Sequence, residues 1–144
     1  MAKGYPDYFG QSIWPKYGTM FIESDSVDTS DASETTVVEK TGPGVWTSYF
    51  GVISSLGAAT TFTIRLYVDG VLLALYPSAS LFTCGYNQGP SQPLHVSLSR
   101  ESDFLLHLSL SHDIPFQTSF KLTIQRGGAI NLTTDYRIGW YKVQ

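Results

Sequence analysis

The chain has 144 residues, of which 9 are Lys or Arg and 12 are Asp or Glu, so its formal net charge is −3 and 15% of its residues are charged. A soluble domain averages roughly 25% charged residues, and an acidic balance without a basic stripe argues against a general nucleic-acid binder. A single cysteine, Cys84, excludes an intrachain disulfide and a thiolate zinc site.

The length predicts one domain with room for a buried core. The two long uncharged stretches, 41–64 and 70–99, are interrupted by Gly, Pro, Ser and Thr, so we expect no membrane span. Since no apolar segment follows a basic region at the N-terminus, we expect the chain as written to be the mature protein, made in the cytoplasm of its host.

The first segment, residues 1–18, combines aromatic side chains with Gly and Pro and shows no period of 2 or 3.6. We predict an irregular N-terminal arm. Because buried aromatic rings cover a large area, the arm is expected to lie either against its own domain or against a neighbouring subunit. In the second case the candidate subunit contacts are its five aromatic residues, Tyr5, Tyr8, Phe9, Trp14 and Tyr17.

A short strand is expected at 20–22, followed by a polar, acidic connector over 24–33. Asp25, Asp28 and Asp31 recur at every third position, whereas a calcium-binding EF-hand loop places its first ligands at alternate positions. We therefore interpret the connector as an exposed loop.

The next strands are predicted at 34–40, 45–53, 61–68 and 71–76. The clearest alternation is in 61–68, which places Phe62, Ile64, Leu66 and Val68 on one face. Asp69-Gly70 separates the last two strands and predicts a two-residue type I′ hairpin, because that turn needs positive φ at both central residues.

Further strands are predicted at 94–98, 103–110, 119–125, 129–133 and 136–143. Alternating apolar stripes support them, and the stripe of Phe104, Leu106, Leu108 and Leu110 carries no charged residue that would protect an exposed edge. Eight to ten strands with one apolar face each predict an all-β protein. We expect an antiparallel two-layer β-sandwich of jelly-roll type over 19–144, with more than about 40% strand and under about 10% helix.

No catalytic constellation is visible, so we expect no enzyme activity, no cofactor and no metal. Cys84 lies in an apolar setting, where a thiol is usually inert. His107, His112 and Asp113 would need a bend at Ser111 to meet at a metal, because five residues of extended strand span about 16 Å. The acids outside the connector sit in the arm, in turns or at strand ends.

Loop aromatics give one binding hypothesis. Trp46, Tyr49 and Phe50, and separately Tyr86 with Asn87 and Gln88, would form a platform on which a sugar ring stacks while amides bind its hydroxyls. The alternative is that the strand carries Trp46 and Phe50 on one face, which contributes to the core.

Four segments of the first half carry a family resemblance: Gly4-Tyr-Pro-Asp-Tyr-Phe-Gly-Gln-Ser-Ile-Trp-Pro-Lys-Tyr-Gly18, Glu34-Thr-Thr-Val-Val-Glu39, Thr41-Gly-Pro-Gly-Val45 and Tyr67-Val-Asp-Gly-Val71. In layout they resemble small β-sandwich structural proteins from virions of tailed bacteriophages. The resemblance implies a capsid decoration, minor capsid or tail-adaptor role in the virion. The same layout is also similar to jelly-roll modules attached to carbohydrate-active proteins.

The resemblance implies other virion proteins as partners, with homo-oligomers, a trimer or a ring, built through sandwich edges and arms. Neither nucleic acid nor a membrane is an expected partner. A carbohydrate- or receptor-binding module is the alternative function, with a glycan as its ligand.

Overall fold

The computed structural model describes residues 17–56, 60–83, 92–100 and 104–143. Strands occupy 72% of these residues and helix 5%, which confirms the all-β prediction. The elements are β1 (Tyr17–Thr29), β2 (Thr35–Thr41), β3 (Gly44–Ser54), β4 (Phe62–Val68), β5 (Val71–Pro77), α2 (Ser78–Thr83), β6 (Leu94–Arg100), β7 (Leu105–Leu110), β8 (Ile114–Phe116), β9 (Ser119–Arg126) and β10 (Leu132–Val143).

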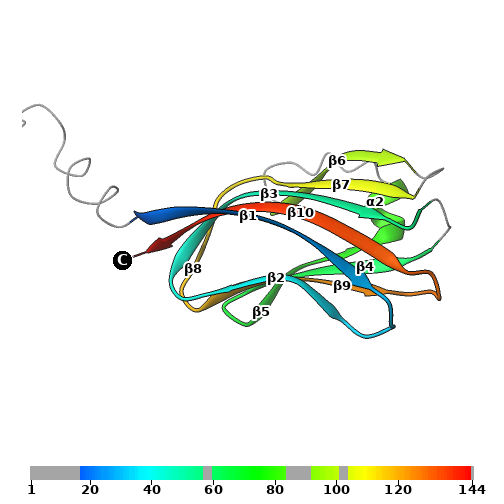
Figure 1. Ribbon diagram of the computed structural model, residues 1–144, viewed down its shortest axis with the longest axis horizontal. Helices are drawn as coiled ribbons and strands as arrows, with labels where there is room; N and C mark the ends of the chain where they lie inside the picture. Colours follow the sequence, from blue (N-terminus) through cyan, green and yellow to red (C-terminus); the bar gives the residue numbers. More distant parts are fainter. Residues whose placement is uncertain (1–16, 57–59, 84–91, 101–103, 144) are drawn as a thin grey trace, which may run out of the picture.

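The strands form two antiparallel sheets that pack face to face (Figure 1). The six-stranded sheet has the order β1-β10-β3-β7-β6, with β8 paired to the other end of β3. The four-stranded sheet has the order β2-β9-β4-β5. Without β6 and β8, the remaining eight strands have the connectivity of a jelly roll, β1-β10-β3-β7 facing β2-β9-β4-β5. The predicted fold is therefore confirmed.

The core lies between the sheets and holds the predicted apolar stripes. Phe62, Ile64 and Leu66 of β4 are buried, while Val68 is half-buried against the same core. Trp46 of β3 stacks on Phe120 of β9 with the ring centroids 4.6 Å apart. The stripe before and along β7 is only partly confirmed, since Leu106 and Leu108 are buried while Phe104 and Leu110 are half-buried. The strand itself lies between β3 and β6, so it is not an exposed edge.

The hairpin predicted at Asp69-Gly70 is present. Asp69 has a φ of 52° and Gly70 a φ of 79°, so both central residues adopt the left-handed conformation that a type I′ turn requires. The Asp69 carboxylate also accepts hydrogen bonds from the backbone N–H groups of Gln117, Thr118 and Ser119 at 2.7–3.2 Å. The turn between β4 and β5 thereby holds the turn between β8 and β9.

The N-terminal predictions need two corrections. β1 begins at Tyr17, so the last two residues of the predicted arm belong to a strand. β1 then continues to Thr29, and the prediction of a polar connector over 24–33 is wrong for its first six residues. These residues pair with β10, and since β1 is an edge strand its polar side chains remain exposed while Thr29 is buried against the core.

A register shift in β3 corrects another expectation. The pairing of β10 with β3 shifts between Gly139 and Trp140, so Trp46 and Tyr49 both face the core although they are three residues apart. Phe50 lies on the opposite face and is 46% exposed. The interpretation that placed Trp46 and Phe50 on one face is therefore wrong.

Candidate functional site

Apart from the three-residue β8, which pairs with β3 alone, four strands end the two sheets of the described structure, and they differ in charge. β1 carries Glu23, Asp25 and Asp28, β2 carries Glu39 and Lys40, and β6 ends at Arg100. The fourth, β5, has no charged residue. Charged side chains on an edge oppose pairing with another chain, so β5 is the one of these four edges that lacks this protection.

The side chains of β5 are apolar and exposed. Ala74 and Tyr76 face the core, while four others lie in solvent: Val71 is 69% exposed, Leu72 45%, Leu73 52% and Leu75 48%. Leu73 is the extra residue at a register shift in the pairing with β4, which brings apolar side chains to successive positions of the strand. Contiguous exposed apolar residues of this kind mark interaction surfaces.

A second apolar segment lies at the start of β1. Met20 and Ile22 are 42% and 57% exposed, and Phe21 stacks on Trp140 with the ring centroids 4.8 Å apart. The next residue, Glu23, forms an ion pair with Lys40 of β2. The apolar part of this edge therefore ends where its acidic part begins.

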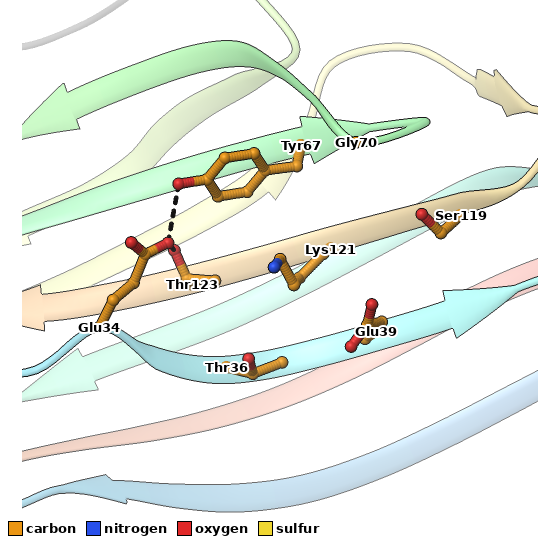
Figure 2. A pocket seen from close by; sticks show the side chains of 8 residues that line it. All are labelled: Glu34, Thr36, Glu39, Tyr67, Gly70, Ser119, Lys121 and Thr123. Carbon is orange, nitrogen blue, oxygen red and sulfur yellow. Dashed lines mark hydrogen bonds between the residues drawn. The ribbon is translucent and has the colours of Figure 1, made fainter.

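The outer face of the four-stranded sheet holds a polar groove of about 420 Å³ (Figure 2). Glu34 is its hub: its carboxylate accepts hydrogen bonds from the Tyr67 hydroxyl at 2.9 Å and from the Thr123 hydroxyl at 2.5 Å. These bonds, with that of Thr123 the stronger cause, hold the pKa of Glu34 below its usual value. The Lys121 ammonium lies 4.9 Å from the centroid of the Tyr67 ring. Since neighbours within the chain use the carboxylate and cover the ring, this cluster joins β2, β4 and β9.

A shallower groove of about 470 Å³ lies on the outer face of the six-stranded sheet. Phe50 and Tyr136 are its aromatic residues. Tyr136 packs partly against the core, while the exposed Phe50 contacts the His107 ring edge-on, with the centroids 5.4 Å apart. Asp135 and Arg137 of β10 lie directly across from Val52 and Phe50 of β3. This groove therefore combines the exposed Phe50 ring with one acidic and one basic side chain of β10, Asp135 and Arg137.

The residues predicted for a sugar platform are not brought together. Trp46 is fully buried and Tyr49 is 4% exposed, so the prediction that they form an exposed platform is wrong for both. Burial raises the pKa of the Tyr49 hydroxyl well above its usual value. Tyr86, Asn87 and Gln88 lie outside the described residues. The structure thus offers Phe50 as the exposed ring of β3.

Of the five aromatic residues predicted as subunit contacts, the structure describes the position of one. Tyr5, Tyr8, Phe9 and Trp14 lie outside the described residues, and Tyr17 is the first residue of β1, opposite Val143. The β5 edge was missed as a site. Its signal was the run Val71-Leu-Leu-Ala-Leu75, in which apolar residues stand at successive rather than alternate positions.

The histidines do not assemble a metal site. Within the described part of the chain, no three His, Cys, Asp or Glu side chains could hold a metal ion together. His107 contacts Phe50, while the His112 ring Nδ1 lies 3.1 Å from the backbone oxygen of Asp113. His95 Nδ1 lies 3.0 Å from the Ser111 hydroxyl. No helix among the described residues has the length and apolar character needed to cross a membrane.

Comparison with known proteins gives little. No protein-family model matches the chain, and no curated protein does. Among solved structures, the chain is similar to the crystal structure of the infectious bursal disease virus VP2 subviral particle, with 17% identity and a TM-score of 0.40. The similarity covers 88% of this chain and 34% of that chain, so this chain spans about a third of that protein's length.

Proposed function

We propose that the chain is a non-enzymatic structural protein of a virion that assembles with copies of itself and with other virion proteins through the edges of its sandwich. One observation carries this proposal: β5 ends a sheet with four exposed apolar side chains and no charge. An edge of this kind promotes aggregation when it is left uncovered. A permanent protein partner removes that hazard.

The fold and the sequence resemblance support the same role. Jelly rolls occur in viral capsid domains and in lectins, and the segments at 4–18, 34–39, 41–45 and 67–71 resemble those of small tailed-phage virion proteins. The finer proposal is a bacteriophage capsid decoration or minor capsid protein. Its location would then be the particle, after synthesis in the host cytoplasm.

The geometry also favours a role without catalysis. Among the hydrogen bonds of the described residues, the contact of His95 with Ser111 is the one that joins a serine hydroxyl to an imidazole, and none joins this imidazole to a carboxylate. A serine nucleophile needs a base that a third group orients. Neither of the two grooves described above contains this pair.

The test is mass spectrometry of particles purified from the source of the gene. We expect the chain to copurify with the particle at a constant ratio to the major capsid protein. Recovery only in the soluble fraction of the lysate, with none in washed particles, would contradict the proposal.

A second function, binding of a carbohydrate, is favoured by one observation. Phe50 presents a half-exposed ring in a groove that Asp135, Arg137 and Ser24 also line. A glycan array probed with the wild type and with Phe50→Ala tests this function. Binding lost in the variant would support it, and an array without hits would remove it.

A further inference from the structure

The two apolar edge segments lie on opposite sides of the sandwich. The ion pair between Glu23 of β1 and Lys40 of β2 shows that those two edges share one side. β5 ends the four-stranded sheet at the far end from β2, and α2 contacts both β5 and β6 on that other side. Within one copy, therefore, neither segment can cover the other.

The charged residues on the sheet edges limit which surfaces the apolar side chains of β5 can pack against. Packing β5 against the charged parts of β1, β2 or β6 would remove charged side chains from water without a partner, which is costly. Met20, Phe21 and Ile22 are the other successive exposed apolar residues on these edges. β6 is also uncharged from Leu94 to Ser99, but Leu98 is its one exposed large apolar side chain. The Met20–Ile22 segment also lies on a sheet edge, because β10 is the one strand among the described residues that pairs with β1.

A head-to-tail contact covers both segments with one kind of interface. A two-fold contact between two β5 strands would bury β5 but leave Met20 and Ile22 exposed in both copies. A contact between β5 of one copy and β1 of the next buries both segments in every copy once the chain of contacts closes. Heterologous contacts of this kind produce rings when the rotation closes.

We infer that β5 of one copy packs against the Met20–Ile22 segment of β1 in the next copy, and that repetition of this contact closes a ring. The partner is a second copy of this chain. The inference rests on the proposed assembly role and specifies its interface. The contact ends before Glu23, so the acidic part of β1 stays in solvent.

Two substitutions test the β5 segment and the β1 segment of the interface independently. Leu75→Lys places a charge in the β5 segment, and Ile22→Lys places one in the β1 segment; both residues are about half exposed, so the fold should tolerate the change. Leu98→Lys is the matched control, because Leu98 is 42% exposed on the β6 edge outside both segments. Circular dichroism confirms that each variant is folded, and native mass spectrometry gives the oligomeric state.

We expect the wild type and Leu98→Lys to form the same ring, and each of the other two variants to be monomeric, with the dissociation constant of self-association raised by more than about 100-fold. A mixture of Leu75→Lys and Ile22→Lys should form a dimer of one chain of each and nothing larger, because one intact β5 then meets one intact β1. Should either lysine variant fail to fold, Leu72→Gln and Met20→Gln replace them.

Three results would overturn the inference. A two-fold β5 contact would leave Ile22→Lys dimeric and give no mixed dimer with Leu75→Lys. A ring that persists in either variant would place the interface elsewhere. A wild type that is monomeric at every concentration would show that a second copy does not cover β5. If the chain is nevertheless found in purified particles, the proposed function stands while this interface is rejected.

Discussion

Trp46 is one of the largest fully buried side chains and packs between the two sheets. Its ring stacks on Phe120 of the opposite sheet and meets Tyr49 edge-on, with centroids 5.6 Å apart. We expect Trp46→Ala to lower the free energy of unfolding by about 3–5 kcal/mol, because it removes a fully buried aromatic ring. Urea unfolding measures this loss.

Phe50→Ala is the control for that measurement. Phe50 lies on the same strand and is 46% exposed, so about half of its ring area contributes to burial and the loss should be at most about half as large. An equal loss in the two variants would contradict the assignment of Trp46 to the core.

Asp69 makes a contribution to stability that depends on pH. The hydrogen bond from the Thr118 backbone N–H, then those of Ser119 and Gln117, lower the pKa of the Asp69 carboxyl. A pKa that is lower in the folded than in the unfolded chain stabilises the fold above the unfolded-state value, and this stabilisation is lost as pH falls through the folded-state value. We therefore expect Asp69→Asn to lower the melting temperature at neutral pH.

The difference in melting temperature between the wild type and Asp69→Asn should shrink as the solution is acidified through the carboxyl range. Thermal unfolding followed by circular dichroism over a pH series measures it. Asp135→Asn, on the exposed face of β10, is the control and should match the wild type throughout. A difference that stays constant with pH would contradict the role assigned to the Asp69 carboxylate.

The β4–β5 hairpin depends on the conformation of Gly70. A Cβ atom at this position would meet nothing within 4 Å, so the cost of Gly70→Ala comes from its φ of 79° alone. We expect a loss of about 1–2 kcal/mol in unfolding free energy, the penalty for a left-handed alanine. Gly128→Ala is the control, since its φ is not in the left-handed region and the nearest atom, Thr60 Oγ1, lies at 3.3 Å. Equal losses in the two variants would argue against the type I′ turn.

Elements with local signals could be predicted from the sequence, whereas elements that depend on distant partners could not. Asp69-Gly70 specifies its own turn, and β4 and β9 alternate with period two, so their positions were predicted to within a residue or so. The polar end of β1 is a strand only because β10 supplies its hydrogen-bond partners, as in the pair of Thr29 with Leu132. Its sequence alone is typical of a loop.

In the candidate site, too, features with a local sequence signal could be predicted and features set by long-range pairing could not. The shift opposite Gly139 and Trp140 turns Trp46 and Tyr49 inward together, and no local pattern in β3 indicates it. The apolar run of β5 was visible in the sequence, yet its exposure follows from its place at the end of the four-stranded sheet. Strand order is set by long-range pairing, so the edge could be identified only from the structure.

At the scale of the whole molecule, the charge distribution predicts how assembly responds to salt. The formal charge of −3 makes copies repel one another, and the exposed acids of β1 lie beside its apolar segment. At about 0.5 M NaCl the Debye length falls below about 5 Å, so this repulsion is screened, while contacts between aliphatic side chains are not weakened. We therefore expect the oligomer to persist or tighten at that salt, as measured by sedimentation velocity. Dissociation would show that ion pairs hold the copies together, and a shift of DNA in a mobility assay would contradict the expectation that the acidic chain does not bind the packaged genome.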